Sequence, residues 1–96
     1  MNVLFRAEAL EDVHAAQAWY DGRRPGLGAE FTDSLSNLLA QIVSFPDSFP
    51  LISDQHRRAL LGRFPYVLYY SRSSDQIEVL ACLHTRQEPG RWRERG

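Results

Sequence analysis

Hydrophobic side chains are most concentrated between residues 57 and 84, where Tyr, Val, Ile and Leu dominate. Polar and turn-forming residues interrupt this stretch at positions 62–65 and again at positions 71–75. Aromatic and β-branched residues favour extended structure, whereas Gly, Pro, Ser and Asp favour turns. The pattern therefore predicts an antiparallel meander of three strands joined by two short turns.

The third predicted strand, residues 77–84, is apolar at nearly every position. Strict alternation along a strand divides its apolar side chains between two faces: Ile77, Val79, Ala81 and Leu83 on one, Leu80 and Cys82 on the other. A strand that is apolar on both faces is typical of the middle of a sheet. We therefore expect this strand to be central, with little water on either face.

Residues 7–20 have the spacing of an amphipathic helix. Ala9, Val13, Ala16 and Tyr20 follow one another at intervals of four, three and four residues, which places them on one helix face. Acidic residues gather in the first turns, where negative charge is favourable for the helix dipole. The segment 21–26 contains Gly and Pro residues and predicts the end of this helix.

A second helix is predicted from Leu27 or Gly28 to about Phe45, and it has the clearest periodicity in the chain. Its apolar positions repeat at intervals of three or four residues: Phe31, Leu35, Leu38, Ile42 and Phe45. Pro46 ends the helix. The short connection to the first helix predicts a helical hairpin whose apolar stripes pack into the core.

Residues 3–6 form a short apolar segment that we interpret as an edge strand, and residues 46–55 form a loop. The predicted order is therefore strand, helix, helix and three strands (β-α-α-β-β-β). Such a chain favours an α+β fold in which a helical hairpin packs on one face of a small antiparallel sheet. A chain of 96 residues suits a single domain, residues 1–96, with one core. The spacing leaves open where the first strand joins the sheet.

The composition excludes several kinds of protein. The single cysteine, Cys82, cannot form a disulfide within the chain, which fits the reducing cytoplasm. The apolar run within residues 1–6 is too short for a signal peptide and is soon followed by a charge. No apolar run approaches membrane-spanning length, so no membrane partner is expected. Metal-ligand spacings, serine-hydrolase motifs and glycine-rich nucleotide motifs are missing, so we expect neither a metal nor a cofactor.

Charge is distributed unevenly along the chain. Residues 1–56 carry three arginines and eight acidic residues, whereas residues 57–96 carry eight arginines and four acidic residues. All 11 basic residues are arginines, whose planar guanidinium matches phosphate and carboxylate groups. A basic second half predicts that the sheet faces an anionic partner. The alternative is that both sets of charges are merely solvated.

The candidate target-binding residues lie near strand ends and in the C-terminal tail: Arg63, His84, Arg86, Arg91, Trp92 and Arg95. His84 and Arg86 share a face of an extended chain, and an imidazole beside guanidinium groups suits acid–base chemistry on a phosphodiester. The alternative is that His84 ends a strand by hydrogen-bonding the tail.

The two tryptophans each have two interpretations. Trp92 lies among the arginines of the tail, and it either docks the tail on the sheet, which we prefer, or stacks on a base. Trp19 lies off the apolar stripe of its helix, and it either caps the hairpin or marks an exposed contact. A turn is expected at Pro89-Gly90.

A series of motifs occurs in order along nearly the whole chain: Ala9, Asp12, Ala16 and Tyr20; Pro25-x-Leu27-Gly28-x-x-Phe31; Phe45-Pro46; Arg57; Phe64-Pro65-Tyr66-x-x-x-Tyr70; His84-x-Arg86; and Pro89-x-x-Trp92-x-x-Arg95. In their order and spacing these motifs resemble the toxins of bacterial type II toxin–antitoxin modules in the RelE/ParE superfamily. The resemblance implies a helical hairpin against an antiparallel sheet. It also implies a cytoplasmic toxin that a small cognate antitoxin neutralises by wrapping around it, and operator DNA binding only through that antitoxin.

The superfamily divides by target, and the chain resembles the ParE branch more closely. RelE-like members cleave mRNA in the ribosomal A site with a basic cluster on the sheet, whereas ParE-like members trap DNA gyrase without chemistry of their own. Val67 occupies one arginine position of the ribonuclease set, Arg86 matches another, and Trp92 is near a tyrosine position.

The leading hypothesis is therefore a gyrase-inhibiting toxin that has no catalytic residues. The alternative is a ribosome-dependent mRNA endoribonuclease that uses Arg86, His84 and Arg58. A third hypothesis is a binding module that pairs with an antitoxin but has lost toxicity.

Overall fold

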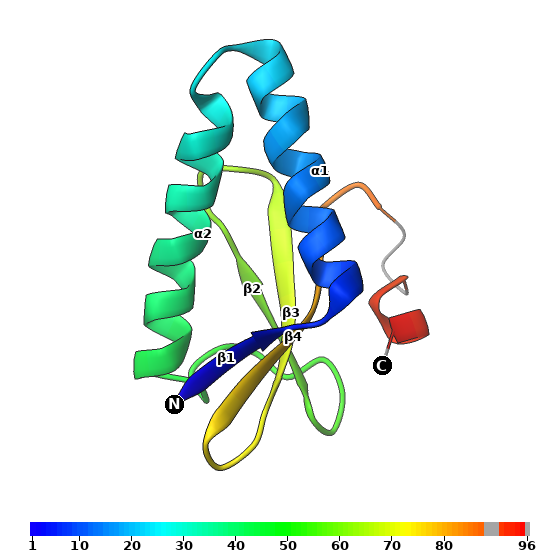
Figure 1. The fold of residues 1–96 in the computed structure, drawn as a ribbon. Helices are drawn as coiled ribbons and strands as arrows, with labels where there is room; N and C mark the ends of the chain where they lie inside the picture. Colours follow the sequence, from blue (N-terminus) through cyan, green and yellow to red (C-terminus); the bar gives the residue numbers. More distant parts are fainter. Residues whose placement is uncertain (88–90, 96) are drawn as a thin grey trace.

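The computed structural model describes residues 1–87 and 91–95, and the turn expected at Pro89-Gly90 lies outside this part of the chain. The elements are β1 (Asn2–Phe5), α1 (Ala7–Arg23), α2 (Leu27–Ser44), β2 (His56–Leu60), β3 (Tyr66–Arg72), β4 (Gln76–His84) and the short 3₁₀ helix η1 (Arg91–Arg95). The predicted α+β order is confirmed, and the helical hairpin lies along one face of the sheet (Figure 1). α1 continues through Gly22 to Arg23, past the end predicted near Tyr20.

The four strands form one sheet in the order β1-β4-β3-β2. Strands β2, β3 and β4 make the expected antiparallel meander, and β4 is central as predicted. β1 joins as an edge strand and pairs with β4 in parallel, with Val3 opposite Ile77. The antiparallel description therefore holds for the meander, while the complete sheet is mixed.

Apolar side chains cover both faces of the sheet. The larger cluster fills the space between the sheet and the hairpin, and it includes the fully buried Phe31, Ile42 and Tyr70. A smaller cluster lies on the opposite face, which we call the open face, and contains Tyr69 and Trp92. The prediction that the central strand meets little water on either face is confirmed, because six of its nine residues are buried, three in each of these two clusters.

The predicted alternation of β4 is wrong beyond Val79. Tyr69 pairs with Ala81 and Tyr70 pairs with Val79, which leaves Leu80 as an extra residue at a β-bulge. Because a bulge inserts one extra residue, the side chains that follow it point to the opposite face from the one that strict alternation predicts. As a result Cys82 joins the cluster under the helices, and Ala81 and Leu83 lie on the open face.

The two helices approach closely at Gly28, which is buried at the start of α2. A Cβ atom added there would lie 2.6 Å from the carbonyl oxygen of Gln17 and 2.8 Å from the side chain of Asp21. The Gly28 amide also donates a hydrogen bond of 2.8 Å to the Asp21 carboxylate. Glycine at this position therefore lets α1 and α2 come together.

We expect Gly28→Ala to lower the free energy of unfolding by about 2 kcal/mol, because overpacking forces the helices apart. Gly22→Ala is the matched control, since a Cβ atom at Gly22 meets nothing within 4 Å. This control should be neutral or stabilising by up to about 1 kcal/mol, because Ala is the better helix former. Urea denaturation of both variants measures the difference, and equal stabilities would contradict the close-packing explanation.

Candidate functional site

Trp92 docks the tail on the open face of the sheet. Its ring lies nearly parallel to that of Tyr69, with an interplanar angle of 13° and centroids 5.8 Å apart. Only 5% of the Trp92 surface is exposed. The preferred interpretation of Trp92 is confirmed, and the ring has no free face on which a nucleic-acid base could stack.

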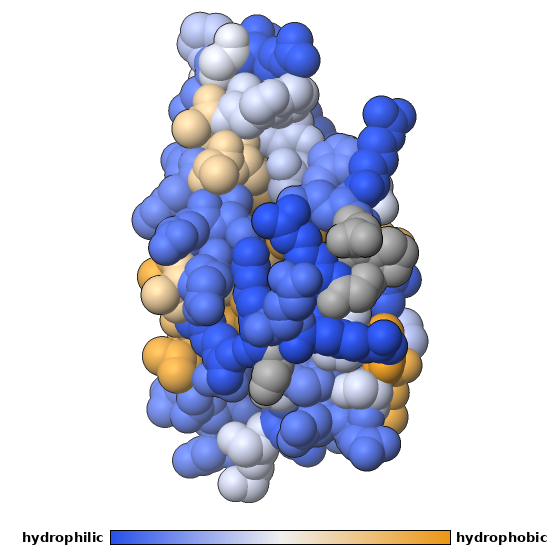
Figure 2. All heavy atoms as spheres, turned by 90° about the vertical axis from the view of Figure 1, so that its right-hand side faces the viewer, coloured by the Kyte–Doolittle hydropathy of each residue, from blue (hydrophilic) through white to orange (hydrophobic). Residues whose placement is uncertain are grey.

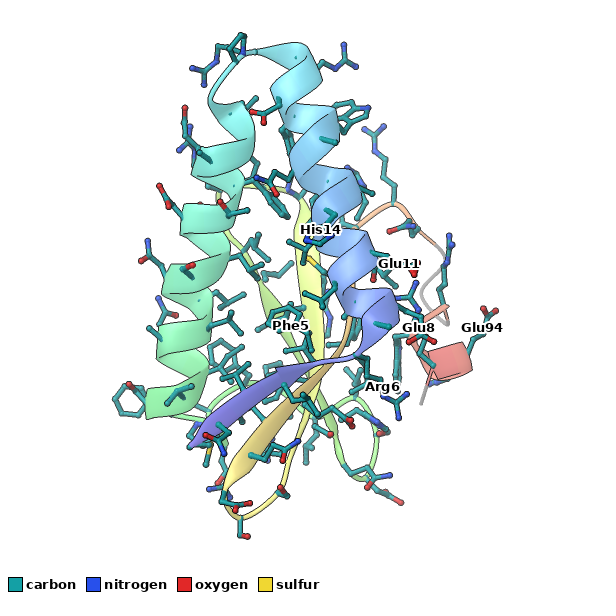
Figure 3. All side chains as sticks on the ribbon, viewed as in Figure 1. Phe5, Arg6, Glu8, Glu11, His14 and Glu94 are labelled. Carbon is teal, nitrogen blue, oxygen red and sulfur yellow. The ribbon has the colours of Figure 1, made fainter. Side chains whose placement is uncertain are left out.

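Arg95 fixes the end of η1 to the helical layer. Its guanidinium forms an ion pair with Asp12 of α1 in which both side chains are only 15% exposed, and the hydrogen bond with Asp12 raises the pKa of Arg95. The guanidinium of Arg6 donates to the carbonyl of Arg95. Figure 3 shows Arg6, Glu8 and Glu11 around the start of α1, beside η1 with Glu94. Arg95, predicted to bind a target, is thus occupied inside the fold.

Asp12 also completes the backbone hydrogen bonding of β4. β1 ends opposite Val79, so the continuation of β4 has no strand on that side. There the amide of Cys82 donates to the Asp12 carboxylate at 2.9 Å, and the amide of His84 donates to the side-chain oxygen of Gln87 at 2.6 Å. These two side chains satisfy donors that a neighbouring strand would otherwise bind.

His84 ends its strand by bonding to the following turn, as the structural alternative predicted. Its Nδ1 accepts a hydrogen bond of 3.0 Å from the backbone amide of Arg86. An Nδ1 that accepts this bond carries no proton, so the neutral ring carries its proton on Nε2. In this state the free ring nitrogen of His84 is a hydrogen-bond donor and not a base.

The open face contains a hollow of about 380 Å³ beside the docked tail. Its polar lining comes from Arg58 on β2, from His84, Thr85 and Gln87 at and after the end of β4, and from Arg93 on η1. The ring of His84 itself lies on the other side of the sheet, 5.2 Å from the ring of Tyr66. Two of the three residues of the ribonuclease alternative, Arg58 and His84, therefore border one hollow, but the imidazole of His84 does not face Arg58. Arg93 and Thr85 are additions that the sequence prediction missed, although Arg93 directly follows the docking residue Trp92.

The other predicted target-binding residues are dispersed. Arg63 lies at the turn after β2 and pairs with Glu30 on α2, and the hydrogen bond from Arg63 lowers the pKa of Glu30. Arg86 and Arg91 are exposed, and neither lines the hollow. The face of the molecule on the side of the tail is mostly hydrophilic, with apolar side chains in small patches (Figure 2).

A second groove, of about 370 Å³, runs between α1 and the uncovered part of β4. Trp19 lines it and is 54% exposed, with the guanidinium carbon of Arg23 4.4 Å from the ring centroid. Trp19 therefore marks an exposed contact, the second of its two predicted roles. Cys82 also lines the groove but is not a nucleophile, because burial raises the pKa of its thiol to about 12.

Within residues 1–87 and 91–95, His, Cys, Asp and Glu side chains form no group of three or more able to hold a metal ion. None of the helices in this part of the chain has the length and apolar character needed to cross a membrane.

Comparison with known proteins identifies the family. No curated protein sequence matches the chain. One solved structure, described as the chromosomal ParDE TA system from P. aeruginosa, superimposes with a TM-score of 0.75 at 15% identity and covers 88% of this chain and 95% of that one. Residues 3–89 match the family model described as "ParE toxin of type II toxin-antitoxin system, parDE". Because this match spans nearly the whole sequence, the chain belongs to the ParE toxin family of type II toxin–antitoxin systems.

Proposed function

We propose that this protein is a toxin that inhibits DNA gyrase by binding it, and that a cognate antitoxin holds the toxin inactive. The observation that carries the proposal is the match of residues 3–89 to the ParE family. The similar fold of a protein from a ParDE toxin–antitoxin system supports an antitoxin as partner. Operator DNA is then bound only through the antitoxin, and the toxin acts in the cytoplasm, where gyrase works.

The geometry of the candidate residues favours binding over catalysis. His84 uses Nδ1 to hold the turn that follows β4, so its neutral ring is not arranged as a general base. Arg86 is exposed and does not line the hollow that contains Arg58. Arg63, Arg86 and Arg91 are the exposed members of the predicted set, and we propose them as contacts to gyrase.

A supercoiling assay with relaxed plasmid tests this function. We expect the purified toxin to block supercoiling by gyrase, and preincubation with the antitoxin to restore it. The double variant Arg86→Gln, Arg91→Gln should inhibit supercoiling only at a higher concentration than the original toxin. The reason is that the variant loses two exposed charges and no buried contact. Normal supercoiling at saturating concentrations of folded toxin would exclude gyrase as the target.

Cleavage of mRNA on the ribosome is the second candidate function. The observation in its favour is the hollow on the open face, which is lined by Arg58, Arg93 and Thr85 and bordered by His84. Incubating the toxin with ribosomes carrying a defined mRNA, followed by primer extension, tests it directly. Uncut mRNA would exclude this activity. If induced toxin is harmless and still binds its antitoxin, the third hypothesis, a binding module without toxicity, holds instead.

A further inference from the structure

Most arginines of this protein already have an internal partner. Among the described residues, six arginines form ion pairs with carboxylates: Arg6, Arg24, Arg57, Arg63, Arg72 and Arg95. Arg23 and Arg93 lie over tryptophan rings. Arg58 has neither kind of contact within this part of the chain, although it is partly buried. A partly buried guanidinium without an anion is unfavourable, and it calls for a ligand.

The strand pairing places Arg58 on the open face. Arg58 is directly opposite Tyr69 on β3, and Tyr69 belongs to the cluster on that face. The next residue, Ala59, belongs to the cluster under the helices, so Arg58 must project the other way. The side chain thus leaves a rigid strand next to the docked tail, where it lines the hollow.

Docking of the tail supplies the second guanidinium. Trp92 is fixed on Tyr69, and the adjacent Arg93 lines the same hollow as Arg58. Thr85, which also lines the hollow, contributes a hydroxyl. The ring of His84 lies on the other side of the sheet, 5.2 Å from the ring of Tyr66, which packs against the cluster under the helices. The described residues that line the hollow include no Asp or Glu. The hollow therefore combines several donors with positive charge that no lining carboxylate neutralises.

We propose that this hollow binds a phosphate of a nucleic-acid backbone without cleaving it. A carboxylate has two oxygens, which one guanidinium can satisfy, whereas two guanidiniums with a hydroxyl match the larger set of phosphate oxygens. The hollow, at about 380 Å³, is also open enough for the neighbouring sugar. Binding without cleavage follows because the imidazole of His84, the candidate general base, lies against Tyr66 on the opposite face of the sheet and does not face the bound phosphate.

This inference goes beyond gyrase inhibition and does not depend on it. Fluorescence anisotropy with a labelled 20-nucleotide single strand, the matching duplex and an RNA of the same length measures binding by the toxin alone. Loss of one phosphate contact should reduce the slope of log K against log salt by about 1. We expect this reduction for Arg58→Gln and for Arg93→Gln, with binding weakened several-fold at low salt.

Two further variants control for folding and net charge. Arg58→Lys keeps the charge but lacks the guanidinium fork, and it should bind with intermediate affinity. Arg23→Gln removes the same charge at the tip of the hairpin, outside the hollow, and should bind as the original protein does. Unchanged thermal unfolding would show that the variants remain folded.

Three outcomes would overturn the proposal. The first is the absence of nucleic-acid binding at low salt, or an equal loss in Arg23→Gln, which would indicate attraction by overall charge. The second is an acidic peptide that binds the hollow more tightly than the single strand does. The third is cleavage of the labelled RNA that depends on Arg58, which would assign the hollow to catalysis. The gyrase assay can succeed or fail independently of all three.

Discussion

Replacing Asp12 by alanine is expected to lower the free energy of unfolding by about 3 kcal/mol, because the change leaves a largely buried charge and a backbone donor without partners. Asp12 pairs with Arg95 and also accepts the amide of Cys82. One carboxylate therefore connects α1, the uncovered side of β4 and the tail. Urea denaturation followed by circular dichroism measures the loss.

Further variants separate the two roles of Asp12. Asp12→Asn keeps an acceptor for the Cys82 amide and loses the charge, so it should lose only part of the stability. Arg95→Ala tests the ion pair from the other side, and Arg72→Ala is its matched control. Arg72 pairs with Asp47, whose side chain is 61% exposed, and exposed pairs contribute under about 1 kcal/mol. If Arg95→Ala were no more harmful than Arg72→Ala, the tail would not be held by this ion pair.

The elements of this fold could be predicted because their signals are local. The spacing of Phe31, Leu35, Leu38 and Ile42 indicates α2, and all four side chains are buried. The apolar run of β4 indicates a central strand, and the strand order agrees. Such patterns depend on residues close together in the sequence, whose periodicity follows directly from backbone geometry.

Two features of the fold had no local signal. The bulge at Leu80 lies in the sequence Val-Leu-Ala, where no glycine or proline marks an irregular strand. The contact between Asp12 and Arg95 joins residues 83 positions apart, and many other acidic and basic residues could have paired. Consequently Arg95 was assigned to target binding although its side chain is used inside the fold.

The candidate site was predicted in part for the same reason. Arg58 and His84 come from strands whose existence the sequence indicates, and they do line one hollow. Arg93 joins them only because Trp92 docks the tail on Tyr69. Arg86, which is two residues from His84, turns away because the hydrogen bond at Nδ1 of His84 ends the extended strand between them. The rule that residues two positions apart share a face applies only within a strand, and Arg86 lies beyond the end of β4.

Phe31→Ala should cause the greatest loss of stability that we predict, about 4 kcal/mol, because a fully buried aromatic side chain leaves a large cavity. Phe31 is 0% exposed and lies where the hairpin meets the sheet. Its ring stacks with Tyr20 of α1 at 5.5 Å and meets Phe64 edge-on at 5.4 Å. These rings come from α1, α2 and the turn before β3, so relaxation at any one of them cannot fill the space.

Phe45→Ala is the matched control for Phe31→Ala, since it removes the same atoms at the other end of α2. Phe45 was placed on the apolar stripe by its spacing, but it is 67% exposed because the helix ends at Ser44. We therefore expect Phe45→Ala to change stability by less than about 0.5 kcal/mol. The denaturation midpoints of the two variants measure the difference in stability, provided that their m-values are equal. Similar losses would mean that the aromatic cluster does not hold the hairpin on the sheet, and the rigid scaffold assumed for the hollow on the opposite face would lose its basis.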